Sequence, residues 1–120
     1  VAAGADFLVS QLFFDNQDYS AFVRRARAAG IEVPIVPGLM PVTNVAQVER
    51  FTKMCGARIP QELHRRLRIV AHDPAAVVAT GVQWTVDQAR ALLAAGAPGL
   101  HLYTLNRSSA SLAVHAALGL

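Results

Sequence analysis

The sequence predicts an α/β protein built on a parallel sheet. Three short apolar runs alternate with helical patterns along its 120 residues, of which 53% are hydrophobic. These runs have the length of strands and lack polar alternation, which is typical of strands buried on both faces of a parallel sheet. Because a helical segment follows each strand, right-handed crossovers make the three strands parallel and cover the sheet with helices.

The first strand comes from the run ADFLVSQLFF at residues 5–14 and is expected over about 6–13. Asp15 and Asn16 can cap the helix that follows, because their side chains accept hydrogen bonds from its first free amides. Gly30 is suited to end that helix. Its expected inward residues are Phe22, Val23, Ala26 and Ala29, and its expected solvent side carries Arg24, Arg25 and Arg27.

The second strand is predicted at about 33–38 in the run VPIVPGL, which Pro37 and Gly38 bring to an end. Thr43 or Asn44 then caps a further helix, which Gly56 ends. The apolar stripe expected along that helix consists of Val45, Val48, Phe51 and Met54.

The remaining elements are marked by proline, glycine and serine. Pro60 is expected at the first position of a helix, and Asp73 begins another that runs to about residue 96, with a break or bend at Gly81. The run GLHLYT predicts the third strand at about 99–104. Ser108 or Ser109 starts the last helix and Gly119 ends it. No linker divides the chain, so residues 1–120 are expected to form one unit without an internal boundary.

Composition excludes several classes of protein. An apolar content of 53% with 16% charged residues is incompatible with disorder. No apolar run approaches the roughly 18 residues of a membrane helix, and the first residues lack the basic stretch of a signal peptide. The lone Cys55 excludes an internal disulfide and fits a reducing compartment. The four histidines match no zinc spacing, so we expect no metal site.

Short motifs of nucleotide binding, hydrolysis and nucleic-acid binding are also missing. The chain has no GxGxxG, no GxxxxGK[ST] and no GxSxG. The basic run HRRLR at 64–68 lacks the interleaved aromatic residues of a single-strand binding surface, so we expect no nucleic-acid partner. One alternative stays open, in which this run and the arginines at 24–27 form a basic interaction module.

Polar side chains gather where the strands end, which is where parallel α/β proteins bind their ligands. They follow the first strand (Ser10, Gln11), the second (loop 37–44, then Gln47) and the third (Tyr103, Thr104, Asn106, Arg107). Together they are suited to a polar heteroaromatic ligand with a carboxylate tail. Each has a structural alternative: Gln11 as a satisfied loop residue, Arg107 in a surface ion pair, Asp15 as a helix cap rather than a catalytic acid, and His101 as a buried, hydrogen-bonded side chain.

Four motifs resemble, in order and spacing, the C-terminal part of methylenetetrahydrofolate reductase. They are SQLFFDNQDY at 10–19, VPIVPGLMPVTN at 33–44, RFTKMCGARIP at 50–60 and GAPGLHLYTLNRS at 96–108. The resemblance implies that the three strands are the last three βα units of a (β/α)8 TIM barrel. Residues 1–120 are then a C-terminal portion of that barrel domain.

The resemblance also implies a function. Family members hold FAD, which NAD(P)H reduces, and convert 5,10-methylenetetrahydrofolate to 5-methyltetrahydrofolate in the cytoplasm, with the complete enzyme expected as a homo-oligomer. Carried over by motif, Gln11 contacts the pterin, Gln47 and Arg107 contact the folate tail, and Phe51 and Tyr103 stack nearby. The family's general acid and its FAD-binding residues have no counterpart here, so no catalytic residue is assigned. The alternative is an inactive, truncated remnant that at most binds folate or a partner.

Overall fold

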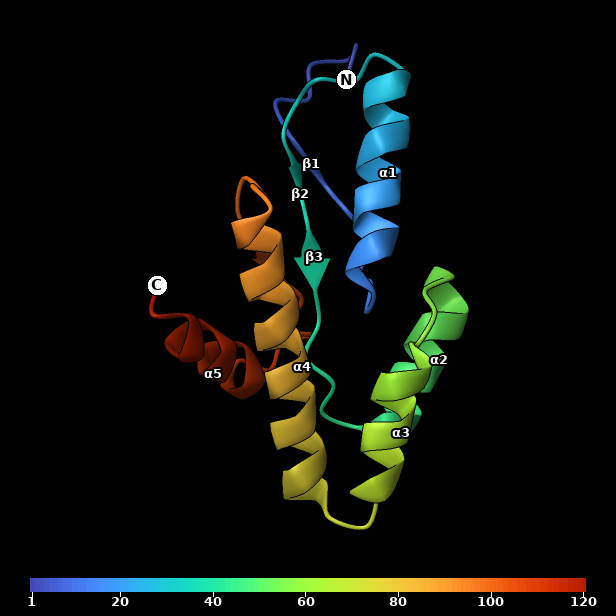
Figure 1. The fold of residues 1–120 in the computed structure, drawn as a ribbon, viewed down its shortest axis with the longest axis vertical. Helices are drawn as coiled ribbons and strands as arrows, with labels where there is room; N and C mark the ends of the chain where they lie inside the picture. The colour runs from blue at the N-terminus through green and yellow to red at the C-terminus, as the bar shows by residue number, and fades with distance from the viewer.

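The computed structural model describes all 120 residues and has five helices and four very short strands (Figure 1). In chain order these are β1 (Leu8–Val9), α1 (Asn16–Ala28), β2 (Ile35–Val36), β3 (Gly38–Leu39), α2 (Val45–Cys55), α3 (Gln61–Ile69), α4 (Pro74–Ala94), β4 (His101–Leu102) and α5 (Ser109–Leu118).

The strands are parallel, as predicted. β1 pairs with β2, Leu8 lying opposite Ile35, and β3 pairs with β4, Gly38 lying opposite His101. Only Pro37 separates β2 from β3, so the middle segment is paired to β1 before the proline and to β4 after it. The single strand expected at about 33–38 is therefore wrong: proline has no N–H to donate, and only its carbonyl contributes, accepting from the His101 amide at 3.0 Å.

The ordered strands are also shorter than the predicted ranges 6–13 and 99–104. The first ends at Val9, although Leu12, Phe13 and Phe14 beyond it are only 5%, 6% and 1% exposed. An apolar run in a sequence indicates buried side chains, but it does not by itself indicate a strand. Here the buried main chain beyond β1 leaves the sheet, and its carbonyls accept hydrogen bonds from side chains instead.

The core has two parts. The larger cluster packs the loop residues Phe14 and Met40 against Val48 of α2 and Leu63 of α3. The smaller one joins Phe13 and Leu39 to α4 and to Tyr19 of α1. Figure 1 shows α4 running along the middle of the molecule, and it packs against α3 and α5. None of the helices combines the length and the apolarity needed to cross a membrane.

The predicted helix caps are confirmed for three helices. Asp15, Asn44 and Asp73 each accept a hydrogen bond from an amide of the turn that follows, at 2.9, 2.9 and 3.1 Å. Pro60 occupies the cap position of α3 rather than its first helical position, so that helix begins one residue later than expected. Ser108 caps α5 without a side-chain hydrogen bond.

Gly81 does not break the fourth helix, contrary to expectation. α4 continues from Pro74 to Ala94, and Gly81 is buried where a Cβ atom would overlap the main-chain carbonyl of Val42. The glycine allows α4 to approach the loop that follows β3.

Four burial predictions are wrong. Phe22 and Met54 are 42% and 80% exposed, although Ala26 and Val48 of the same predicted stripes are buried as expected. Ala29 lies beyond the last turn of α1 and is also exposed. His101 is exposed rather than buried, and its ring meets Tyr103 edge-on with 4.6 Å between centroids.

Candidate functional site

A groove of about 460 Å³ lies at the carboxyl ends of β3 and β4. Its walls come from the loop after β3, the start of α2, the loop after β4 and the start of α5. Gln47, Tyr103 and Arg107 all line it. The structure therefore brings together three of the residues predicted from the sequence, although they are separated by up to 60 positions.

Gln47 is presented by the first turn of α2. Its main-chain amide donates to Oδ1 of the capping Asn44 at 2.9 Å, which fixes the start of the helix. Its side-chain amide has no hydrogen-bond partner within the chain and is half-buried at the groove. An amide in this state can both donate to and accept from a ligand.

Arg107 follows a tight turn in the left-handed region. Leu105 and Asn106 have φ values of 50° and 64°, and the Arg107 amide closes the turn on the Thr104 carbonyl at 2.9 Å. A leucine in this conformation is uncommon and costs energy, and such positions cluster at functional sites. The turn sets Arg107 at the groove, and the surface ion pair considered from the sequence is absent, since no carboxylate contacts the guanidinium.

Arg50 also lines this groove, and the sequence reasoning missed it. It lies three positions after Gln47 on α2, a spacing that places two side chains on one helix face, so the signal was present in the sequence. The groove thus holds the guanidiniums of Arg50 and Arg107, while none of its lining residues is acidic. Its electrostatic character is positive.

Of the two residues predicted to stack near the ligand, Tyr103 lines the groove and Phe51 does not. The Tyr103 hydroxyl donates to the Ser10 carbonyl at 2.9 Å, so it is already occupied. Phe51 is half-buried against the larger core cluster and does not line the groove.

Gln11 lies in a different groove, of about 790 Å³, between the end of β1, α1 and the α2–α3 connection. Its Oε1 accepts from the Leu12 amide at 3.0 Å, while its side-chain nitrogen has no partner and the residue is exposed. Ser10 lines this groove and Tyr103 lines the other, so the Tyr103–Ser10 hydrogen bond lies between Gln11 and the pair Gln47 and Arg107.

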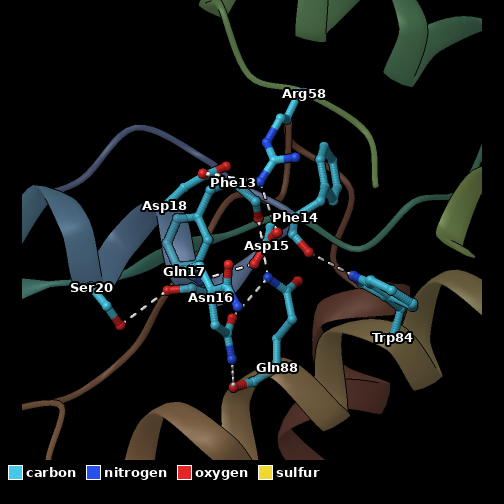
Figure 2. A network of polar contacts seen from close by, with 10 residues as sticks. All are labelled: Phe13, Phe14, Asp15, Asn16, Gln17, Asp18, Ser20, Arg58, Trp84 and Gln88. Atoms are coloured by element: carbon cyan, nitrogen blue, oxygen red, sulfur yellow. Dashed lines mark hydrogen bonds and ion pairs between the residues drawn. The ribbon is translucent and has the colours of Figure 1, made fainter. Parts of the chain in front are cut away.

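Asp15 is a structural residue. One carboxylate oxygen caps α1, and the other accepts from Arg58 at 2.8 Å, as Figure 2 shows. Arg58 also reaches Asp18 at 3.4 Å. With both oxygens engaged, the expected helix cap is confirmed, and nothing in this arrangement marks Asp15 as a catalytic acid.

The basic run at 64–68 is partly compensated within α3. Glu62 pairs with Arg65 at 2.7 Å and with Arg66 at 2.9 Å. Hydrogen bonds from Arg65 and Arg66 lower the pKa of Glu62 to about 2. Arg68 contacts the His64 ring at 3.1 Å. Glu62 thus offsets part of the positive charge of this run, and the basic interaction module considered from the sequence is not tested by these contacts.

Parallel strands whose carboxyl ends carry amide and guanidinium groups have the chemistry suited to a polar ligand with an anionic part. The family model described as methylenetetrahydrofolate reductase matches residues 1–119. The chain belongs to the methylenetetrahydrofolate reductase family.

Individual relatives agree with this assignment. The chain is 39% identical to methylenetetrahydrofolate reductase (NADH) 1 of Arabidopsis thaliana over 120 residues, which is 100% of this chain and 20% of the plant protein. It is 39% identical to a probable methylenetetrahydrofolate reductase (NADPH) of Caenorhabditis elegans, with 98% of this chain and 18% of that protein covered. The 5,10-methylenetetrahydrofolate reductase of Escherichia coli is 35% identical, with 99% and 40% covered. The chain thus spans between about a fifth and two fifths of these relatives.

Proposed function

We propose that the chain is the folate-binding part of a methylenetetrahydrofolate reductase, which reduces 5,10-methylenetetrahydrofolate to 5-methyltetrahydrofolate with FAD and NAD(P)H. The observation that carries this proposal is the groove that presents Gln47 and Arg107 together with no acidic lining residue. Membership of the family supports the choice of folate as its ligand.

The chemistry of the groove suits the two ends of a folate. A guanidinium can hold a carboxylate through two parallel hydrogen bonds, which fits Arg107 to the glutamate tail. Glutamine amides match the mixed donor and acceptor edge of a pterin, the role we propose for Gln11. Gln47 lies at the groove with Arg107, and we place it on the tail or the aminobenzoyl group.

The three parallel segments support a place in a (β/α)8 barrel, because β1, the β2–β3 segment and β4 lie side by side in chain order. Phe7, just before β1, and Val9, within it, are 58% and 41% exposed, as expected of a sheet face that further parts of a barrel domain cover. We propose that residues 1–120 form one continuous portion of such a barrel.

FAD, when bound, supplies the hydride that reduces the folate, but the residues of this chain do not fit a flavin site. A flavin diphosphate favours free helix N-termini, and those of α1, α2 and α4 are filled by their own Asp15, Asn44 and Asp73 side chains. The starts of α3 and α5 lack a side-chain cap, but that of α3 carries the acidic Glu62 in its first turn and that of α5 belongs to the folate groove. We therefore place the FAD contacts in the parts of the longer relatives that this chain does not match.

The chain's own contribution is then binding and orientation. Gln11, Gln47 and Arg107 hold the folate in one pose, and holding reactants in a productive geometry supplies a large part of enzymatic rate acceleration. No residue here is assigned a proton transfer. The partly exposed, unpaired Cys55 fits the cytoplasmic setting that we propose, with the complete enzyme as a homo-oligomer.

The test is equilibrium binding of 5-methyltetrahydrofolate to the complete polypeptide that contains residues 1–120. Arg107→Ala is expected to weaken binding about tenfold or more, because it removes hydrogen bonds to a charged group. Arg68→Ala, an exposed arginine that lines neither this groove nor that of Gln11, is the matched control and is expected to change nothing. Equal affinity of the two variants would refute the assignment of the groove.

A further inference from the structure

The loop that carries Gln11 is buried but belongs to no strand. Beyond the Ser10 amide, which donates to the Val36 carbonyl at 2.9 Å, its main chain makes no further main-chain hydrogen bond to the sheet, although residues 12–14 are almost fully inaccessible. Buried main-chain carbonyls need partners, and three side chains distant in sequence supply them here. Tyr103 donates to Ser10, Gln88 to Phe13 and Trp84 to Phe14, at 2.9, 3.3 and 3.0 Å.

Gln88 makes the most extensive of these contacts. Its Nε2 donates both to the Phe13 carbonyl and to Oδ1 of Asn16, the latter at 3.1 Å. The Asn16 side-chain nitrogen donates in return to the main-chain carbonyl of Gln88 at 3.1 Å. Figure 2 shows this two-way contact between α4 and the loop at the start of α1.

The burial of Gln88 is energetically unfavourable, which indicates that its side-chain N–H donors contribute to the structure. The residue is 5% exposed, and its Oε1 is buried without a hydrogen-bond partner. An apolar side chain of similar shape at this position avoids that unsatisfied acceptor, so burial alone does not account for a glutamine. What the glutamine adds is the pair of N–H groups that hold Phe13 and Asn16.

Trp84 lies one helical turn before Gln88 on α4 and holds the next carbonyl of the loop. Its indole is itself fixed by the Arg66 guanidinium, 5.5 Å from the ring centroid. α4 also contacts the other ligand-binding loop: Val78 lines the groove of Gln47 and Arg107. One rigid helix therefore contacts both the Gln11 loop and the groove.

From this arrangement we propose that Gln88 and Trp84 are positioning residues. They fix the main chain of loop 10–14, so that Gln11 keeps a constant position relative to Gln47 and Arg107. The inference rests on the proposed folate function and deepens it. Neither residue touches the ligand; both act through Gln11.

The test is a double-mutant cycle in the complete polypeptide that contains residues 1–120. Gln88→Met keeps the length of the side chain and removes its donors. It is expected to weaken 5-methyltetrahydrofolate binding about fivefold in the native background and to have no further effect when Gln11→Ala is present. Gln83→Met is the matched control, because Gln83 is exposed on the same helix and bonds only to Asp87. Equal losses with and without Gln11, or equal effects of the two methionine variants, would overturn the proposal.

A second readout does not depend on folate. The Leu12 amide is bonded to Oε1 of Gln11, so its hydrogen exchange reports the order of the loop. Gln88→Met is expected to accelerate that exchange more than Gln83→Met does, and unchanged exchange contradicts the positioning role. If the native protein binds no folate, the proposed function fails while this exchange result still decides the role of Gln88.

Trp84→Phe provides an independent variant in case Gln88→Met does not fold. It keeps an aromatic ring against the core and removes only the indole donor to Phe14. The same coupling to Gln11→Ala and the same faster exchange of Leu12 are expected. Additive losses of affinity would show that Trp84 has a structural role alone.

Discussion

The Tyr103 hydroxyl donates a 2.9 Å hydrogen bond to the main-chain carbonyl of Ser10, and so joins the end of β4 to the end of β1 across the middle segment. The ring passes over Gly38, where a Cβ atom would come within 2.6 Å of Tyr103 Cε2 and 2.7 Å of the Ser10 carbonyl oxygen. The absence of a side chain at Gly38 therefore permits this crossing, which lies between the two grooves.

Tyr103→Phe is expected to lower the free energy of unfolding by about 1 kcal/mol, because it removes this hydrogen bond and keeps the ring. Urea unfolding of the variant measures the effect. Thr104→Val is the control, since the exposed Thr104 side chain makes no hydrogen bond within the chain. A Tyr103→Phe variant as stable as the native protein would show that the Ser10 contact contributes nothing.

Gly81→Ala is expected to destabilise the protein, although alanine is the better helix former by about 1 kcal/mol. The added methyl group would overlap the Val42 carbonyl, and such overpacking typically costs about 1 to 3 kcal/mol. Thermal unfolding measures the balance. Gly99→Ala, where nothing lies within 4 Å of the added carbon, is expected to be tolerated. A stabilised Gly81→Ala variant would contradict the close approach of α4 to the loop after β3.

Glu62 gives α3 a pH-dependent contribution to stability. Its pKa is lowered from 4.5 to about 2 by hydrogen bonds from Arg65 and Arg66. A lowered folded-state pKa means that the contribution is present above pH 4.5 and is lost as the pH falls towards 2. In Glu62→Gln, the loss of stability between these pH values is expected to be smaller than in the native protein, as measured by unfolding at each pH. Identical pH profiles would exclude the pairing.

Arg50→Ala tests the residue that the sequence reasoning missed. We expect weaker binding of 5-methyltetrahydrofolate at low ionic strength, by about two- to fivefold, because the groove loses one of two uncompensated cations. The difference should shrink in high salt, which screens an exposed charge. An effect that does not depend on salt would indicate a packing role for Arg50 instead.

Local signals in the sequence predicted the parts of the fold that are determined locally. The caps at Asp15, Asn44 and Asp73 depend on amides two or three residues away, so their sequence context was sufficient. Gly81 shows the opposite case. A glycine is needed there because the main chain of Val42, nearly 40 positions earlier, leaves no room for a Cβ atom. No local sequence pattern distinguishes this requirement from a helix break.

Some features of the candidate site were likewise predictable from the local sequence, and others depend on distant residues. The position of polar residues after apolar runs placed Gln47 and Arg107 at strand ends, and the parallel topology brought them together. The separation of Gln11 from them could not be predicted, because it depends on how residues 10–14 leave the sheet. That path is fixed by Gln88 and Tyr103, which are more than 70 positions away.

The most direct test of the folate assignment is the rate at which 5,10-methylenetetrahydrofolate reoxidises the reduced flavin in the complete polypeptide that contains residues 1–120. We predict saturable reoxidation, with the half-saturating folate concentration raised about tenfold by Arg107→Ala and unchanged by Arg68→Ala, which lies outside both grooves. No reoxidation by this folate, or the same half-saturating concentration in both variants, would contradict the account.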